Sequence, residues 1–164
     1  MRLFIAINFN NETRTRLLSF RNELRLHSER GNFTTPENLH LTLLFLGECD
    51  DRQTTAAKQV MDGLVFEPFD VQIDHVGCFK RTGGDIWWAG VQENTTLSKL
   101  YHALNNEKRE YSPHITLGRE VVTDYRPQRI EPFGETINSI DLMKSERIKG
   151  KLIYTPIYKC EGKR

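Results

Sequence analysis

Apolar residues in this chain follow two spacings, one typical of strands and one of helices. Alternating or continuous apolar stretches rich in β-branched and aromatic residues predict strands at residues 3–8, 39–46, 69–79, 86–91, 136–144 and 151–158, and a further strand that starts at Pro113. Apolar positions three and four apart predict a helix capped by Asn10 or Asn11 that continues to about Arg30 and is ended by Gly31. A second helix is capped by Asp50 or Asp51 and ends near Gly63, and a third runs from Thr96 to about Asn105.

Two of the predicted strands form a hairpin. The turn falls at Thr82-Gly83-Gly84-Asp85, between residues 69–79 and 86–91. The alternation slips by one residue near His75, which predicts a β-bulge there.

The order of elements forms an approximate internal repeat. Strand, helix, strand and helix in the first half are followed by strand, helix and strand in the second. We therefore expect an α+β fold in which residues 1–164 form a single bilobal domain. Its two pseudo-symmetric lobes would each be a small, mostly antiparallel sheet with helices on the outer face and a cleft between the sheets.

One tetrapeptide pattern, His-x-Thr-Leu, occurs twice. It is found as His40-Leu41-Thr42-Leu43 and as His114-Ile115-Thr116-Leu117, each within a predicted strand. Side chains two apart on a strand share a face and stand roughly 6.6 Å apart, so each copy presents one imidazole and one hydroxyl to the same space. A single copy could be structural, with the histidine bonded to a backbone carbonyl at a strand end. Burying both polar pairs without partners would cost roughly 1 to 3 kcal/mol per group, which favours a functional interpretation of the duplicated motif.

Two imidazoles and two hydroxyls around one cleft suit attack on a phosphodiester. One neutral histidine can deprotonate an attacking water while one protonated histidine protonates the departing oxygen, each transfer contributing roughly 10²- to 10⁴-fold. Thr42 and Thr116 would donate to the nonbridging oxygens, whose charge rises toward the transition state. This chemistry requires no metal, and the residues alone do not decide which histidine is the acid.

The composition indicates which classes of partner and site are unexpected and in which compartment the protein is expected. The formal net charge of +1 gives no general attraction to nucleic acid, so any anion binding must be local. The three cysteines lack CxxC spacing, which argues against a disulfide framework, a zinc site and a thiol nucleophile. The apolar N-terminal stretch turns polar at Asn8, and no later stretch is long enough to span a bilayer, so we expect a cytoplasmic protein with no membrane association.

Several further residues are candidates for the cleft. Arg119 suits a phosphate, although strict alternation aims it away from His114 unless Gly118 permits a local twist or bulge. Phe45 could stack on a base, although alternation places it with the core leucines, and the core interpretation is favoured. We expect the other aromatic and histidine residues to belong to the core, the cleft wall or the surface, namely Trp87, Trp88, Tyr154, His27, His75 and His102.

The sequence resembles the two-histidine HxTx phosphoesterases, in particular the RNA 2′,3′-cyclic phosphodiesterases once called 2′-5′ RNA ligases. The resemblance runs nearly end to end, through Leu3-Phe4-Ile5-Ala6-Ile7, residues 36–43 with Phe45-Leu46-Gly47, residues 111–119, and Leu142-Met143-Lys144-Ser145-Glu146. It implies a bilobal α+β fold, hydrolysis of a terminal 2′,3′-cyclic phosphate to a 2′-phosphate, and no metal or nucleotide cofactor. It also implies that His40 is the proton donor and His114 the proton acceptor.

The same motifs fit several substrates and activities. The leading hypothesis is a metal-independent phosphodiesterase, a monomer acting on RNA ends or small nucleoside cyclic phosphates. Alternatives are a module that binds RNA ends or forms 2′-5′ RNA junctions, an enzyme for 2′-5′ oligoadenylates or ADP-ribose cyclic phosphate, and a noncatalytic interaction domain with the same fold.

Overall fold

Two antiparallel sheets form an α+β, bilobal structure in this computed structural model, which describes residues 1–105 and 111–163. The first sheet has the strand order β3-β1-β8-β9. Its strands are β1 (Arg2–Asn8), β3 (His40–Glu48), β8 (Ser139–Ile148) and β9 (Lys151–Glu161). The second sheet has the order β2-β6-β5-β4-β7. Its strands are β2 (Ser28–Phe33), β4 (Phe69–Phe79), β5 (Asp85–Val91), β6 (His114–Thr123) and β7 (Gln128–Ile137).

The expected internal repeat is visible in the strand pairing. In the first half, β1 is followed by helix α1 (Asn11–Leu26), by strand β2 and then by the motif strand β3, which pairs antiparallel with β1. In the second half, β5 is followed by helix α3 (Thr95–Asn105) and then by the motif strand β6, which pairs antiparallel with β5. Each motif strand therefore occupies the equivalent position beside the strand that precedes the helix.

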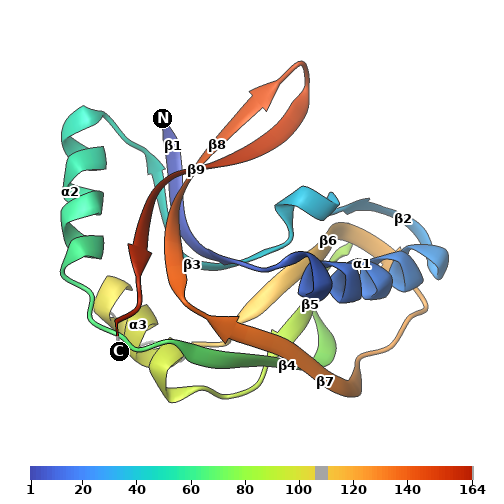
Figure 1. Cartoon of the computed structure of the whole chain (residues 1–164). Coiled ribbons are helices and arrows are strands. Elements are labelled where there is room, and N and C mark those ends of the chain that lie inside the picture. Colours follow the sequence, from blue (N-terminus) through green and yellow to red (C-terminus); the bar gives the residue numbers. More distant parts are fainter. Residues whose placement is uncertain (106–110, 164) are drawn as a thin grey trace.

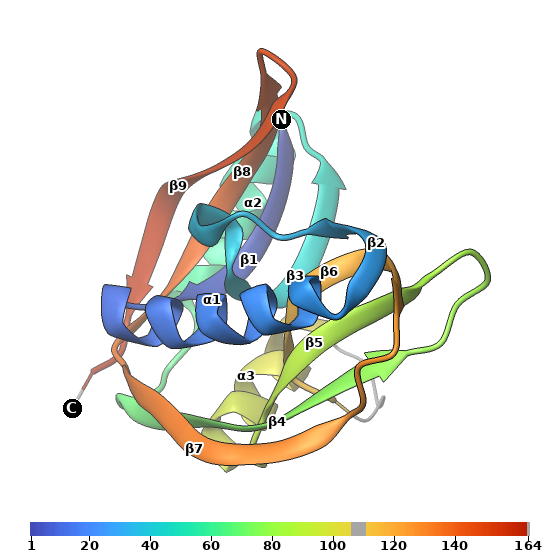
Figure 2. The ribbon, with the colours of Figure 1, turned by 90° about the vertical axis from the view of Figure 1, so that its right-hand side faces the viewer.

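The helices lie outside the sheets, and two of them cover the sheet of the other half. Helix α1 contacts β6 and β7 of the second sheet, whereas α3 contacts β3 of the first. Helix α2 (Asp51–Asp62) lies beside the first sheet and contacts β9 (Figure 1). A short 3-10 helix, η1 (Pro36–Asn38), leads directly into the first motif strand (Figure 2).

Polar side chains fix the starts of two helices. The Asn10 side chain accepts a hydrogen bond of 2.9 Å from the amide of Thr13 at the start of α1. At the start of α2, Asp50 and Gln53 form a reciprocal capping box. Each cap stabilises its helix by about 1 kcal/mol, and both lie where the sequence predicts them.

The apolar run in β1 is buried on both faces of the first sheet. Leu3, Ile5 and Ile7 belong to the main core, while Phe4 and Ala6 pack on the opposite face against Met143 and Tyr154. Burial on both faces explains why this strand is continuously apolar instead of alternating. Its second face supports the cavity described below.

One predicted helix is too long. We expected α1 to continue to about Arg30, but it ends at Leu26 and is followed by strand β2, which pairs with β6. The β2 sequence is mostly polar and partly exposed, so it carries no strand periodicity. Its conformation depends on the partner strand at the sheet edge, which local sequence does not reveal.

A second strand was also missed. One strand was predicted over residues 136–144, but the chain forms two, β7 and β8, separated by Asn138. Edge strand β7 contains the exposed Pro132, which interrupts the apolar pattern and is tolerated because an edge strand needs fewer amide donors.

The predicted hairpin and bulge are both confirmed. Strands β4 and β5 pair antiparallel and are joined by residues 80–84. The register between Ile73 and His75 shifts relative to both neighbouring strands, β5 and β7. This irregularity is the bulge expected near His75.

Candidate active site

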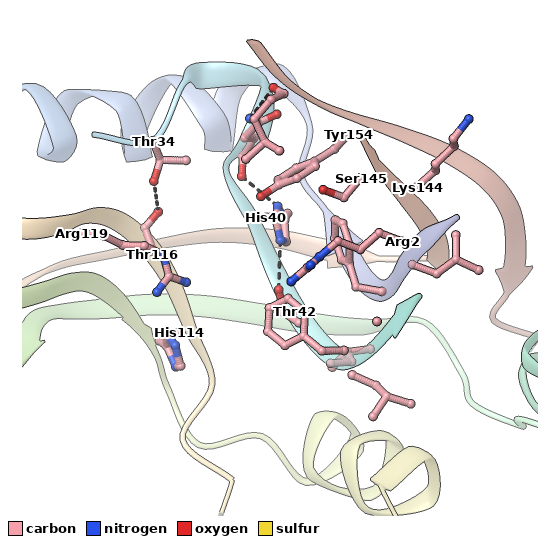
Figure 3. Close-up of a pocket in the computed structure, with 18 of the residues that line it drawn as sticks. Arg2, Thr34, His40, Thr42, His114, Thr116, Arg119, Lys144, Ser145 and Tyr154 are labelled. Atoms are coloured by element: carbon pink, nitrogen blue, oxygen red, sulfur yellow. Dashed lines mark hydrogen bonds between the residues drawn. The ribbon is translucent and has the colours of Figure 1, made fainter. Parts of the chain in front are cut away.

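Both His-x-Thr pairs line one cavity of about 1100 Å³ between the two sheets. Figure 3 shows His40 and Thr42 on β3, with His114 and Thr116 on the adjacent β6. The expected convergence of the two motifs is therefore confirmed.

Aromatic rings and a backbone carbonyl hold His40 in place. Its ring lies 4.9 Å from that of Phe4 and 5.1 Å from that of Tyr154, measured between centroids. Its Nδ1 lies 2.8 Å from the carbonyl oxygen of Asn38. Because a carbonyl oxygen only accepts, Nδ1 carries a proton and donates it, and Nε2 is left to face Thr42 Oγ1 at 2.9 Å.

The second histidine is held by the same kind of contacts. His114 Nδ1 donates to the carbonyl oxygen of Ser112 at 2.8 Å. The His114 ring lies 5.2 Å from Phe79 and 6.0 Å from Trp88. Its Nε2 has no hydrogen-bond partner within the described part of the chain, which leaves this atom available to a ligand.

Burial sets the protonation state of His40. Desolvation lowers the pKa of His40 to about 4, against a smaller opposing effect of its hydrogen bond to Asn38. The imidazole is therefore neutral near pH 7 when the cavity holds no anion. In this form Nε2 accepts from the Thr42 hydroxyl.

The two motif threonines have different partners. The Thr42 hydroxyl is bonded to His40, whereas that of Thr116 makes no hydrogen bond to any described residue. The Thr116 backbone is fixed instead, because its carbonyl accepts a bond of 2.9 Å from Thr34 Oγ1 (Figure 3). The Thr116 hydroxyl can donate to a bound oxyanion, and the Thr42 hydroxyl can do so once His40 Nε2 is protonated.

Arg119 faces the cavity although strict alternation would turn it away. Strand β6 has a register irregularity between the pairs Trp88–Thr116 and Trp87–Gly118, so an extra residue lies between them. This bulge changes the direction of the following residues, and Arg119 lines the same cavity as His114. The sequence left open a local twist or bulge at Gly118, and the irregularity lies next to this residue.

The prediction that Phe45 belongs to the core was wrong. Its side chain is 69% exposed and lines the cavity, with its ring 6.1 Å from Phe4. A register shift in β3 explains the change, because Ile5 pairs with Leu44 while Ala6 pairs with Thr42. The extra residue reverses the alternation before Phe45.

The remaining predicted aromatic and histidine residues divide between core, wall and surface. Trp87 is buried, whereas Tyr154 lines the cavity and Trp88 packs beside His114. His27 is half exposed near Asp124, and His75 is bonded to Asp74.

Sequence reasoning missed several cavity residues, including Arg2 and Phe4. Both belong to β1, whose continuous apolar run gives no indication that one of its faces lines a cavity.

Residues 1–105 and 111–163 contain no metal centre, no disulfide and no membrane-spanning helix. No group of three or more histidine, cysteine, aspartate or glutamate side chains in this part is arranged to hold a metal ion. Cys49, Cys78 and Cys160 are free thiols. No helix in the described residues has the length and apolar character to cross a bilayer.

The geometry supports proton transfer at one bound oxyanion. Two histidines, each with Nδ1 fixed by the carbonyl of the residue two positions earlier, contribute Nε2 atoms to one cavity. Two threonine hydroxyls and the Arg119 guanidinium add donors for negatively charged oxygens. This set suits general acid–base catalysis at phosphorus.

Known proteins resemble this chain in sequence and architecture. The family model described as LigT like Phosphoesterase matches residues 7–88. An RNA 2′,3′-cyclic phosphodiesterase of Thermotoga maritima is 30% identical, with 98% of this chain and 95% of the relative covered. One of the same name from Archaeoglobus fulgidus is also 30% identical, over 82% of this chain and 85% of the relative. The crystal structure of Escherichia coli LigT complexed with 3′-AMP has a TM-score of 0.86 and 26% identity, covering 99% and 98% of the two chains. This chain therefore belongs to the LigT-like phosphoesterase family.

Proposed function

We propose that this protein hydrolyses a 2′,3′-cyclic phosphate, at an RNA end or on a nucleoside, to a 2′-phosphomonoester. The observation that carries the proposal is the convergence of both His-x-Thr pairs on one cavity. Relatives named RNA 2′,3′-cyclic phosphodiesterases, 30% identical over most of this chain, support it. The structural relative that holds 3′-AMP supports a nucleotide as the ligand.

In the proposed reaction, His114 is the proton acceptor. Its Nε2 takes a proton from water as the water oxygen forms a bond to phosphorus. The bond between phosphorus and the ribose 3′ oxygen breaks, and His40 gives a proton to that oxygen. Thr42, Thr116 and Arg119 bind the nonbridging oxygens as their negative charge increases.

The donor role requires His40 to gain a proton on substrate binding. Burial lowers the pKa of His40 to about 4, so the imidazole is neutral in the empty cavity at neutral pH. A phosphodiester anion beside the ring favours the charged form and raises this pKa. We therefore infer that substrate binding is accompanied by proton uptake.

Both proton transfers are assigned to histidines, so the proposal includes no metal ion or cofactor. It also treats the protein as a cytoplasmic monomer. We infer that the base of the substrate stacks on Phe45, whose exposed ring lies at the cavity wall.

The test is a substrate panel assayed in EDTA. It contains the four nucleoside 2′,3′-cyclic phosphates, a cyclic-ended RNA, a 2′-5′ oligonucleotide and an ADP-ribose cyclic phosphate. We expect turnover of the nucleoside and RNA cyclic phosphates to 2′-phosphates, unaffected by EDTA.

Three results would contradict the proposal. Activity that disappears with chelation would show that a metal takes part in the reaction. Turnover restricted to the 2′-5′ or ADP-ribose substrate, or net formation of 2′-5′ junctions from RNA halves, would assign the cavity to a different reaction.

A further inference from the structure

The cavity wall contains three arginines that have no carboxylate partner among the described residues. The wall contains Arg2, Arg119 and Arg147, and none of their guanidiniums lies within ion-pair distance of a carboxylate in the described residues. The two carboxylates of the wall are already paired, since Glu48 lies 3.6 Å from the terminal amine and Glu146 lies 3.0 Å from Lys144. The cavity therefore has an excess of positive charge although the chain is nearly neutral.

Two of these arginines belong to the first sheet, on the side of the cavity that holds His40. Arg2 on β1 pairs with Ser145 on β8, and Ser145 pairs with Tyr154 on β9, so these three residues form one row across the sheet. Arg147 lies two residues beyond Ser145 and shares its face. Figure 3 shows Arg2 extending toward His40 and Thr42, whereas Lys144 points away from them.

All three arginines act electrostatically on the phenol of Tyr154, which also lines the cavity. Burial raises the pKa of Tyr154, while Arg119, Arg147 and Arg2 each oppose the shift. The Tyr154 ring lies 5.1 Å from that of His40. The positive charge is therefore next to the site proposed for the reacting phosphate.

Arg147 is carried by a regular hairpin. Strands β8 and β9 project beyond the rest of the sheet in both views (Figures 1 and 2). Ile148 pairs with Lys151 across a two-residue turn in which Lys149 and Gly150 both have positive φ, the geometry that favours a tight hairpin. Arg147 also donates to the carbonyl oxygen of Gly150 at 3.2 Å, which ties it to this turn.

We propose that Arg2 and Arg147 bind a second phosphate of the substrate, the one on the 5′ oxygen of the nucleoside whose cyclic phosphate lies between the histidines. This inference rests on the proposed function. The group can come from two sources, a 5′-phosphomonoester on a single nucleoside or the phosphodiester that joins the preceding nucleotide in RNA. Both place an anion at the same atom of the terminal nucleoside.

Three features support this ligand. Arginine forks match the paired oxygens of a phosphate better than lysine ammonium groups do. The chain as a whole carries a net charge of only +1, so the arginines of the cavity wall favour a local anion over a long polyanion. The volume of about 1100 Å³ exceeds the range of roughly 300 to 1000 Å³ typical of small-ligand pockets, which leaves room for a second phosphate.

The first test compares kcat/KM for three substrates that share one base. They are a nucleoside 2′,3′-cyclic phosphate with a 5′-hydroxyl, the same compound with a 5′-phosphate, and a dinucleotide ending in the cyclic phosphate. We expect the 5′-phosphorylated compound to be preferred over the 5′-hydroxyl by about tenfold or more. A dinucleotide turned over better than the 5′-phosphorylated nucleoside would identify RNA as the source, and the reverse order would identify the monoester.

Substitutions of the two arginines test whether their side chains cause the preference for a 5′-phosphate. Arg2→Gln and Arg147→Gln should each reduce kcat/KM for the 5′-phosphorylated substrate about tenfold more than for the 5′-hydroxyl substrate. The matched control is Arg52→Gln, because Arg52 is exposed on α2 and does not line the cavity. Arg52→Gln should leave the ratio of kcat/KM for the two substrates unchanged.

Equilibrium binding gives a readout that does not need turnover. Calorimetry should show that a nucleoside 2′,5′-bisphosphate binds at least tenfold more tightly than the nucleoside 2′-phosphate, and that Arg2→Gln removes most of the difference. Equal affinities would overturn the inference, as would an arginine variant that weakens both ligands equally. Absence of turnover on every cyclic phosphate, with the bisphosphate preference intact, would instead overturn the proposed function and leave the phosphate subsite.

Discussion

The imidazole of His40 lies 4.9 Å from the ring of Phe4, with 30° between their planes, on the cavity side of the first sheet. Phe4 is itself buried, so one face of the imidazole is shielded from water. This contact and the neighbouring Tyr154 account for the desolvation that holds the pKa of His40 at about 4. The buried position of His40 therefore has consequences for both stability and catalysis.

We predict that His40 makes the protein less stable in mild acid. In the unfolded chain this histidine titrates at about 6.5, whereas in the folded protein its pKa is about 4, so the unfolded state binds more protons between these values. The free energy of unfolding should fall by up to about 3 kcal/mol from this group as the pH drops from about 6.5 to 4.

Urea unfolding at pH 7 and pH 4.5 measures this effect. His40→Gln should lose less stability between the two pH values than the wild type, because carboxylates contribute equally to both proteins. Identical pH dependence in the two proteins would show that His40 is not desolvated in the folded state.

Phe45 should matter for substrate binding and little for stability. The side chain is largely exposed, so Phe45→Ala should change the free energy of unfolding by less than about 0.5 kcal/mol. Loss of a stacking ring should raise KM for a nucleoside cyclic phosphate by about tenfold.

The matched control for Phe45 is Leu26→Ala. Leu26 is also exposed but lies at the end of α1, outside the residues that line the cavity. Chemical unfolding and steady-state kinetics on both variants separate the two effects. A large loss of stability in Phe45→Ala with KM unchanged would assign the ring a packing role instead.

The two motif threonines should respond differently to the same substitution. Thr42→Val removes the hydroxyl bonded to His40 and should cost about 1 kcal/mol of stability, whereas Thr116→Val breaks no hydrogen bond among the described residues. Both should lower kcat by about 100-fold, because each loses a donor to the phosphate.

Unfolding curves and single-turnover rates on the two valine variants measure this contrast. If Thr116→Val retains the wild-type rate, its hydroxyl does not contact the reacting phosphate.

The sequence indicated most of the site because the two motifs are local and repeated. Each His-x-Thr pair needs only the alternation of one strand to place both side chains on one face, and the strand pattern predicts that alternation. The repeat of strand, helix and motif strand then places the two copies in equivalent sheet positions.

The missed features depend on contacts between distant parts of the chain. The orientation of Phe45 is set by a bulge in the pairing of β3 with β1, and such shifts leave no mark on residues 43–45 themselves. Strand β2 is ordered by pairing with β6, about 90 residues away in sequence, as the pair Asn32–Arg119 shows. Arg2 acquires a cavity position only because β8 and β9 return to complete the first sheet.

The central claim, that His40 and His114 act together on one phosphate, is tested most directly by comparing single and double variants. The measurement is kcat/KM for a nucleoside 2′,3′-cyclic phosphate with His40→Gln, His114→Gln and the double variant, with folding checked by circular dichroism. We predict that each single variant loses at least about 10³-fold and that the double variant is scarcely slower than either, because residues that act as a unit are not additive. Losses that multiply in the double variant, or a single variant with nearly wild-type activity, would contradict the account.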